Sequence, residues 1–326
     1  MTKLIIQIPC LNEAATLPAT LAELPRAIPG VDLIEYLVID DGSTDGTSEV
    51  ARTHGVHHVV RFKRHRGLAA AFTAGIDASL RQGADVIVNT DADNQYPGEH
   101  IPRLIEPLLS GKFDVAIGDR NIREIAHMSW YKKLLQRAGS WAVRRVSNTA
   151  VPDTTSGFRA YTRDAALRMT VVSEFSYTLE TIIQAGKKRM AIAHVEIPTN
   201  ARTRPSRLFD SMYGYIKRSA ATIVRIYTMY EPLKVFSYLG GVAFLIGFAV
   251  AMRFVVSYLT YGYEEGKIQS LILAAAMMIV GMNIVLIGFV ADAIANSRKL
   301  TEDVLYRMRK MELDNDRRDR RAGDRG

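Results

Sequence analysis

The sequence predicts an α/β domain followed by two membrane-spanning helices, and three observations support this prediction. Short apolar runs alternate with segments of helical periodicity over the first 120 residues, which is typical of a mostly parallel sheet with helices on both faces. Basic amphipathic segments come next, and two long apolar stretches lie after residue 230. We therefore expect a globular domain over 1–207, an amphipathic helix within 208–232, membrane helices within 233–295 and a charged tail over 296–326.

Each strand of the predicted sheet is a short apolar run that ends in polar residues. Strands are expected at 4–8, 34–39, 58–61, 86–89 and 115–117. Between them, helices are expected at 15–24, 44–54, 68–82 and 101–109, where apolar residues recur at helical spacing. Ser43-Thr44-Asp45 and Pro97 mark two of the helix starts. The glycine patterns of a dinucleotide site and of a P-loop are absent from the sequence.

Two later segments combine helical spacing with many basic residues. Residues 128–146 carry Trp130 and Trp141 among lysines and arginines, and residues 208–230 carry four tyrosines. Aromatic and basic residues together suit the headgroup layer of a membrane, so we expect two helices at the membrane surface. A basic surface helix docked on its own domain is the alternative for 128–146.

The apolar stretches at 235–258 and 270–291 are each near the roughly 20 residues that a helix needs to cross a bilayer. Arg253 is the interior charge of the first stretch and lies close enough to its end to snorkel. The segment between the stretches holds Glu264 and Glu265, whereas the other flanks are rich in Lys and Arg. The positive-inside rule then predicts a multi-pass protein of the plasma (inner) membrane with the globular domain and both termini in the cytoplasm. Buried core helices are the alternative.

The tail from about Asp314 alternates Asp and Arg with almost no apolar residue, so we expect it to be disordered. Glycines within the spans would let membrane helices approach closely, which allows a homo-oligomer. These glycines are Gly240, Gly241, Gly247, Gly281 and Gly288.

Charge and cysteine content narrow the classes of function. The formal net charge is +8, which suits an anionic membrane surface or nucleic acid. The basic residues cluster beside the apolar spans, so we expect a membrane partner and no nucleic acid. Cys10 is the single cysteine, which excludes an internal disulfide framework and a cysteine-based zinc site.

Asp91 and Asp93 follow the predicted strand at 86–89 with one residue between them. Parallel sheets bind ligands at the carboxyl ends of their strands, so this pair lies where a site would form. Two carboxylates suit a hard divalent cation that keeps some waters and is completed by substrate phosphates, which describes Mg²⁺ or Mn²⁺ rather than Zn²⁺. A solvated turn is the alternative, since Asp is also a common turn residue.

Several motifs accompany this pair in a fixed order after successive strands. They are Pro9-Cys10-Leu11-Asn12-Glu13, Asp40-Asp41-Gly42-Ser43-Thr44-Asp45, Asp91-Ala92-Asp93-Asn94-Gln95-Tyr96-Pro97, Gly118-Asp119-Arg120 and Asp153-Thr154-Thr155-Ser156-Gly157-Phe158-Arg159. Through them, residues 4–210 resemble the family-two glycosyltransferases of GT-A fold, specifically the polyprenyl-phosphate (dolichyl- or undecaprenyl-phosphate) sugar transferases. The resemblance implies a Rossmann-like mixed sheet that binds a nucleotide sugar, and the two spans match the membrane-anchored subgroup in outline. For the homo-oligomer, the resemblance implies a tetramer.

The resemblance also implies which residues bind the donor. The expected nucleotide-sugar contacts are Pro9, Leu11, Glu13, Asp40, Asp41, Arg66, Asp91, Ala92, Arg202 and Arg204. Asp91, Asp93 and Gln95 would hold the Mg²⁺ or Mn²⁺ that bridges the diphosphate.

Other roles remain open for some of these residues. Turn capping is the alternative for Asp40, and a solvated basic loop is the alternative for Arg66. The segment 199–207 could instead make a polybasic contact with the membrane.

For the acceptor, the resemblance implies a lipid phosphate, which is largely ionised at neutral pH because its second pKa is near about 6. Such a nucleophile needs positioning more than deprotonation. Arg120 and Arg159 are expected to hold phosphates, with a structural salt bridge as the alternative for each. Some relatives carry a carboxylate, proposed as a base, immediately before the Phe-Arg pair; here that position is Gly157, which leaves Asp153 as a distant substitute. Together with Asp93, these residues form the expected catalytic set.

These expectations combine into an inverting transferase that moves one sugar from a UDP- or GDP-linked donor to a polyprenyl phosphate, giving a lipid-linked monosaccharide phosphate. A processive polysaccharide synthase should carry a Gln-x-x-Arg-Trp motif and more spans. A catalytically silent membrane scaffold of the same fold is an alternative of a different class, and metal-dependent nucleotide binding would separate it from an enzyme.

Overall fold

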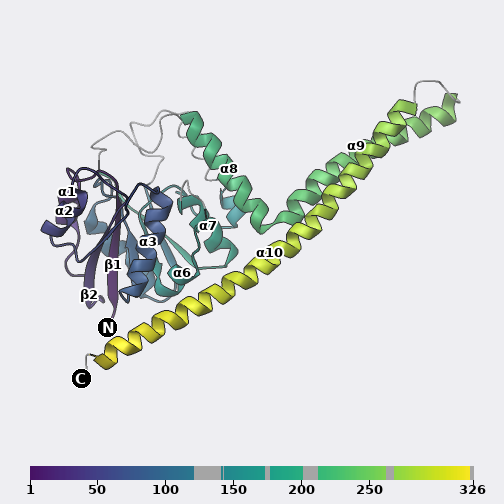
Figure 1. Ribbon diagram of the computed structural model, residues 1–326. Helices are drawn as coiled ribbons and strands as arrows, with labels where there is room; N and C mark the ends of the chain where they lie inside the picture. The colour runs from purple at the N-terminus through teal and green to yellow at the C-terminus, as the bar shows by residue number, and fades with distance from the viewer. Residues whose placement is uncertain (121–140, 142, 173–176, 201–211, 262–267, 324–326) are drawn as a thin grey trace. The chain divides into compact units, whose positions relative to one another are not determined.

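The computed structural model describes residues 1–120, 141, 143–172, 177–200, 212–261 and 268–323 (Figure 1). The chain forms two units, one made of Met1–Ile223 with Tyr306–Gly326 and the other of Val224–Leu305. The first unit contains an α/β domain. The second contains two long apolar helices.

A mixed sheet lies at the centre of the α/β unit, with its described strands in the order β3-β2-β1-β4-β6-β5-β7. Their bounds are β1 Lys3–Cys10, β2 Leu33–Asp40, β3 His58–Arg61, β4 Val86–Asn89, β5 Val115–Asp119, β6 Arg159–Thr162 and β7 Ile192–Glu196. β6 runs antiparallel to β4 and β5, and the other neighbouring pairs are parallel. The mixed sheet and the strands predicted from apolar runs are confirmed. The same pattern misses β6 and β7, because β6 begins with an arginine and β7 has a mixed apolar and polar sequence.

Helices cover both faces of this sheet, which explains why β1 is apolar along its length. Because strand side chains alternate, Leu4, Ile6 and Ile8 point to one face, where they share a core with residues of α1, α2 and α4. The α3 helix packs on β1 and β2, and α6 and α7 lie beside it (Figure 1). The bounds are α1 Leu17–Glu23, α2 Thr47–Thr53, α3 Leu68–Arg81, η1 Gly98–His100, α4 Ile101–Leu109, α6 Arg163–Arg168 and α7 Tyr177–Lys187. The four predicted helices of this region are confirmed.

Most of the amphipathic helix predicted at 128–146 lies outside the described residues. Residues 141 and 143–147 are helical, with Trp141 63% exposed and Val143 buried. The second predicted amphipathic helix is confirmed as α8, Met212–Tyr230. Contact of either helix with a membrane stays a prediction.

The second unit contains α9, Pro232–Tyr261, and the first part of α10, Ile268–Gly323. Both helices are long and apolar enough to cross a membrane, and few of their side chains are buried. The alternative of buried core helices is therefore not supported in the described part of the chain. These two helices are candidate membrane spans.

Glycines let α9 and α10 approach closely within one chain. A Cβ added at Gly240 would lie 2.5 Å from the carbonyl oxygen of Gly281, and one at Gly247 would lie 2.8 Å from the carbonyl oxygen of Ala274. A Cβ at Gly288 would lie 2.8 Å from Cβ of Phe236. These glycines therefore serve packing inside a helical hairpin, and association between copies of the chain stays a prediction.

The C-terminal stretch of α10 belongs to the α/β unit and contacts α6. The hydroxyl of Tyr306 donates to Oδ1 of Asp164 at 2.5 Å. The guanidinium of Arg168 lies over the Tyr306 ring at 4.7 Å from its centroid, a cation–π contact. This end of the helix therefore has specific partners on the domain surface.

The next turns of α10 contact the end of α3. Nη1 of Arg81 lies 3.2 Å from Oε1 of Glu312, and the neighbouring Leu313 is buried. The helix continues to Gly323, so the expectation of a disordered tail from Asp314 is wrong. Composition alone misjudged this segment because its contacts lie on a distant part of the sequence.

Candidate active site

The loop after β4, residues 91–95, carries the predicted acidic pair and is called the acidic loop. The backbone amide of Gln95 donates to Oδ1 of Asp93 at 3.1 Å. The carbonyl of Ala92 accepts a hydrogen bond from the hydroxyl of Thr20 at 3.0 Å. These bonds fix the loop at the edge where β1, β2 and β4 present their carboxyl ends, as the sequence predicts.

The carboxylate of Asp91 is in a place that disfavours a lone negative charge. Burial and the nearby charge of Asp93 raise the pKa of Asp91 to about 7, while the charge of Arg120 acts in the opposite direction. A positive ion placed beside the two carboxylates would remove this disadvantage.

A divalent cation fits the donors of the acidic loop. No cluster of three or more His, Cys, Asp or Glu side chains that could hold a metal occurs within the described residues. The carboxylates of Asp91 and Asp93 could hold Mg²⁺ or Mn²⁺, ions that keep several waters and are completed by substrate phosphates. Gln95, the predicted third ligand, contacts Asp93 through its backbone amide.

Arg120 and Asp153 form a buried ion pair. Nε and Nη2 of Arg120 donate to the two carboxylate oxygens of Asp153 at 2.6 and 3.0 Å, and Nη2 also donates to Oγ1 of Thr155 at 2.7 Å. Burial alone would raise the pKa of Asp153, but Arg120 and Thr155 lower it below its usual range. For Arg120, the structure therefore shows a structural salt bridge, which was the alternative to a phosphate contact. It also argues against Asp153 as a base, because both of its oxygens are engaged.

Arg159 is held by hydrogen bonds within the protein. It is the first residue of β6 and is 1% exposed. Its guanidinium donates to the carbonyls of Ser156, Thr178 and Thr154 at 2.8, 2.8 and 3.1 Å, and to the hydroxyl of Thr181 at 2.6 Å. With all three nitrogens engaged, Arg159 fixes the loop before β6 against α7, and phosphate contact is not supported.

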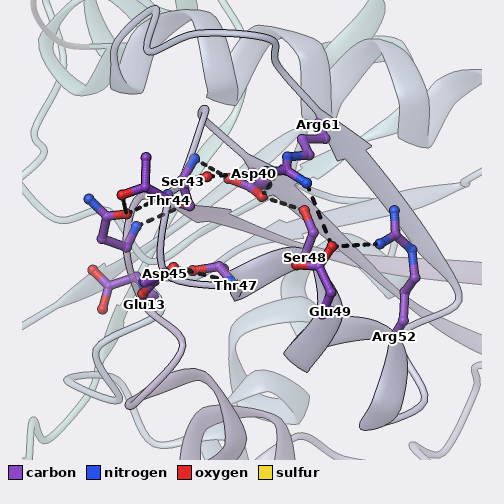
Figure 2. A network of polar contacts seen from close by, with 11 residues as sticks. Glu13, Asp40, Ser43, Thr44, Asp45, Thr47, Ser48, Glu49, Arg52 and Arg61 are labelled. Atoms are coloured by element: carbon purple, nitrogen blue, oxygen red, sulfur yellow. Dashed lines mark hydrogen bonds and ion pairs between the residues drawn. The ribbon is translucent and has the colours of Figure 1, made fainter.

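Asp40 caps the turn after β2 and is fully buried (Figure 2). Its Oδ1 accepts from the amide of Ser43 at 2.7 Å, and its Oδ2 accepts from the hydroxyl of Ser48. Nε of Arg61 lies 3.6 Å from the same Oδ2. The turn-capping alternative is thus what the structure shows for Asp40, and a direct nucleotide contact is not supported.

Asp41 holds the loop that leads into α3. Its two oxygens accept from the amides of Arg66 and Gly67 at 2.7 and 2.9 Å, and Nδ1 of His65 lies 2.8 Å from Oδ2. The loop crosses so closely over Gly42 that a Cβ there would lie 2.6 Å from the loop backbone, and Gly42 has φ +77°. Asp41 thus sets the position of this loop at the edge where β1, β2 and β4 present their carboxyl ends.

Glu13 lies in the turn after β1, which is joined to the turn after β2. Asn12 has a left-handed backbone with φ 55°, and its Oδ1 accepts from the amide of Thr44 at 2.9 Å. The amide of Glu13 donates to Oγ1 of Thr47 at 3.0 Å, and its Oε2 accepts from Thr16 at 2.6 Å. Figure 2 shows Glu13 at one side of the polar residues that follow β2. The two predicted donor motifs are therefore brought together.

The remaining predicted donor contacts lie at the same edge or outside the described residues. Pro9 pairs in register with Ile39 near the end of β1, and Leu11 follows that strand directly. The guanidinium of Arg66 lies 4.9 Å from the centroid of the Phe62 ring.

Arg202 and Arg204 fall outside the described residues, but the chain leading to them is placed. The amide of Asn200 donates to the carbonyl of Gln95 at 3.0 Å, and its side chain donates to the carbonyl of Asn94 at 3.0 Å. Asn200 is therefore tied to the acidic loop, and contact of Arg202 and Arg204 with the donor stays a prediction.

Sequence reasoning missed a set of buried polar groups behind the acidic loop. Nδ2 of Asn89 donates to the carbonyl of Gly157 and to the hydroxyl of Tyr177, both at 2.9 Å. The hydroxyl of Tyr96 accepts from the amide of Gly157 at 3.3 Å. An asparagine that ends an otherwise apolar strand was a usable signal for Asn89. Tyr177 had none, because its partners are distant in sequence.

Comparison with known proteins shows that the sequence is similar to glycosyltransferases. Residues 5–169 match the pattern of glycosyl transferase family 2. The chain is 33% identical over 199 residues to the undecaprenyl-phosphate mannosyltransferase of Micrococcus luteus, covering 59% of this chain and 80% of that protein. It is 28% identical over 269 residues to the undecaprenyl-phosphate 4-deoxy-4-formamido-L-arabinose transferase of Aeromonas hydrophila, covering 79% of this chain and 78% of that protein.

The fold is similar to that of solved transferases. One is glucosyl-3-phosphoglycerate synthase from Mycobacterium tuberculosis in complex with Mn²⁺, UDP-glucose and phosphoglyceric acid, at 22% identity and a TM-score of 0.54, covering 68% of this chain and 79% of that chain. The same synthase with Mg²⁺ and UDP gives 20% identity and a TM-score of 0.53, with coverage of 68% and 79%. At this identity the likeness shows the fold, a mixed sheet of GT-A type. From its sequence match and its fold, the chain belongs to glycosyl transferase family 2.

Proposed function

We propose that this protein is an inverting glycosyltransferase that moves one sugar from a UDP- or GDP-linked donor to a polyprenyl phosphate in a membrane. The observation that carries the proposal is the presence, in one chain, of a family 2 match over residues 5–169 and of two candidate membrane spans. The relatives from Micrococcus luteus and Aeromonas hydrophila, both named as undecaprenyl-phosphate transferases, support a lipid phosphate as the acceptor.

The donor binds at the joined turns after β1 and β2 and extends to the acidic loop. Glu13 lies in the first of these turns and Asp41 holds the loop next to the second, which supports contact of both with the nucleoside end of the donor. Asp91 and Asp93 hold Mg²⁺ or Mn²⁺, which when bound neutralises the charge that builds on the leaving nucleoside diphosphate. Arg202 and Arg204 contact the diphosphate in this proposal, which the hydrogen bond from Asn200 to the acidic loop, two residues before Arg202 in the sequence, supports.

The acceptor phosphate needs orientation and countercharge more than a base. It is largely ionised at neutral pH, because a phosphate monoester has a second pKa of about 6. Asp153 is unsuited to proton removal, since Arg120 and Thr155 occupy its oxygens. The positive charge of Arg120 acts on Asp91 and lowers its pKa, against the larger effects of burial and Asp93.

The reaction takes place at the cytoplasmic face of the plasma (inner) membrane. Lys and Arg flank the candidate spans on the side of the catalytic domain, whereas acidic residues lie in the segment between the spans. In this arrangement the enzyme takes its nucleotide sugar from the cytoplasm, and the lipid-linked product stays in the membrane. We also propose a homo-oligomer, which the exposed side chains of the two candidate spans would allow.

The test is transfer of labelled sugar to lipid by purified protein. The protein is incubated with Mg²⁺ or Mn²⁺, polyprenyl phosphate and, in parallel, labelled UDP-glucose, UDP-N-acetylglucosamine, UDP-galactose and GDP-mannose. One donor should give a labelled lipid with a single sugar, and Asp93→Ala should abolish it. Asp32→Ala is the matched control, because Asp32 is an exposed carboxylate just before β2, at the opposite end of that strand from the site.

Two results would overturn the proposal. A product with many sugars per lipid would indicate a processive synthase. No labelled lipid with any donor, together with intact metal-dependent nucleotide binding, would indicate a protein that binds the donor without this transfer.

A further inference from the structure

The peptide of Gly157 is held from both sides by buried side chains. Its carbonyl accepts from Nδ2 of Asn89 at 2.9 Å and from the hydroxyl of Tyr177 at 3.3 Å. Its amide donates to the hydroxyl of Tyr96 at 3.3 Å. The Tyr96 ring is itself stacked on Phe158, with 5.1 Å between the centroids. The position of this peptide is therefore set by groups from β4, the acidic loop region and α7.

The fixed peptide forms a surface against which Asp91 lies. A Cβ added at Gly157 would be 3.0 Å from both carboxylate oxygens of Asp91 and 3.2 Å from the hydroxyl of Tyr177. A methyl group at this position would require Asp91 or the Gly157 backbone to shift by a few tenths of an ångström. Any movement of this peptide would thus change the room available to Asp91.

Tyr177 is suited to hold this surface in place. Its ring is fully buried and stacks on Phe72, with 4.0 Å between the centroids and 3° between the planes. Arg159 lies over the ring at 5.9 Å and binds the carbonyl of the next residue, Thr178, at 2.8 Å. Burial and the charge of Asp91 raise the pKa of Tyr177 well above its usual range, so the hydroxyl remains a neutral donor.

We propose that Tyr177 is a positioning residue for the acidic loop: with Asn89 it fixes the Gly157 peptide, and that peptide fixes the Asp91 carboxylate for the cation. The inference rests on the metal-dependent part of the proposed function and is independent of the lipid acceptor. It assigns a role to α7, which carries none of the expected site residues.

The test compares two single-oxygen deletions that leave the packing intact. Tyr177→Phe keeps the ring on Phe72 and removes the hydroxyl. Tyr161→Phe is the matched control, because Tyr161 is also fully buried beside Phe72, and its hydroxyl has no hydrogen-bond partner among the described residues. Mn²⁺ binding is followed by electron paramagnetic resonance with UDP, and with GDP in a parallel series. Tyr177→Phe removes the hydrogen bond that the hydroxyl donates to Gly157 and the one that it accepts from Asn89, whose amide keeps its own bond to Gly157. We expect a rise of about two- to tenfold in the Mn²⁺ dissociation constant for Tyr177→Phe and no change for Tyr161→Phe.

A second variant probes the same contact from the other side. Gly157→Ala places a methyl group against Asp91 and should weaken Mn²⁺ binding more than Tyr177→Phe does. Unchanged Mn²⁺ binding in Tyr177→Phe would overturn the proposal, and so would equal weakening in both tyrosine variants. Absence of Mn²⁺ binding by the wild-type protein would overturn it together with the metal part of the proposed function. Intact Mn²⁺ binding without lipid product would count against the acceptor alone.

Discussion

Breaking the Arg120–Asp153 ion pair should destabilise the α/β unit strongly. Asp153 is fully buried, and each of its oxygens accepts a hydrogen bond from Arg120 at 2.6 or 3.0 Å. Asp153→Asn keeps the shape of the side chain but leaves the guanidinium without its countercharge. Removing one partner of a buried pair typically costs about 3–5 kcal/mol. For a unit of this size, that loss lowers Tm by roughly 6–20 °C.

The assay is thermal unfolding of the detergent-purified protein in a double-mutant cycle. The set consists of wild type, Asp153→Asn, Arg120→Gln and the double variant, at pH 7. Each single change should lower Tm by a similar amount, and the double variant should lose less than the sum of the two. Additive losses, or a Tm for Asp153→Asn within about 1 °C of wild type, would refute the reasoning. A phosphate ligand would behave differently, since Arg120→Gln would then reduce transfer with little change in Tm.

Three further predictions follow from other parts of the structure. Chelation of divalent cations should abolish sugar transfer and added Mg²⁺ or Mn²⁺ should restore it, as measured by labelled lipid; full activity after chelation would contradict the proposed site. The single charge reversals Arg81→Glu and Glu312→Arg should each increase hydrogen exchange in residues 306–315 by up to about fivefold, and the double reversal should restore protection; an unchanged exchange rate in both singles would show that the pair does not hold the helix. Burial would raise the pKa of Glu35, but hydrogen bonds from Lys3 and His58 outweigh it and lower the pKa, so the stability that Glu35 contributes is full above the usual glutamate range and is lost as pH falls through the lowered pKa. Glu35→Gln should therefore flatten the acid side of a curve of Tm against pH. A curve parallel to that of the wild type would contradict this.

The strands and the acidic loop were predictable because their signals are local. An apolar run such as 86–89 followed by Asp91 and Asp93 needs no knowledge of the rest of the chain. The hydrogen bonds inside the turns after β1 and β2 were harder to predict. A carboxylate that caps a turn and one that binds a nucleotide look alike in sequence. Asp40 illustrates this, because only the structure shows that Ser43 and Ser48 occupy its oxygens.

Arg159 and Tyr177 show a second limit of sequence reasoning. The Phe-Arg motif predicted a phosphate contact for Arg159, but its partners lie in the loop before β6 and in α7. Tyr177 meets Asn89 across 88 positions of the sequence. Such pairings depend on how strands are ordered in the sheet, which periodicity and motif spacing do not specify.

The docking of α10 makes the catalytic unit discontinuous in sequence. Its first segment ends at Ile223, and a second segment returns at Tyr306 after the chain has passed through the helical hairpin. A truncated protein that stops before α9 would keep every residue of the predicted site and still lack a part of its own surface. Asp164 and Arg81 would then lose their contacts with Tyr306 and Glu312, and these parts of the surface would be exposed to water. A soluble version of this enzyme should therefore carry the Tyr306–Gly326 segment, joined through a linker that replaces the hairpin.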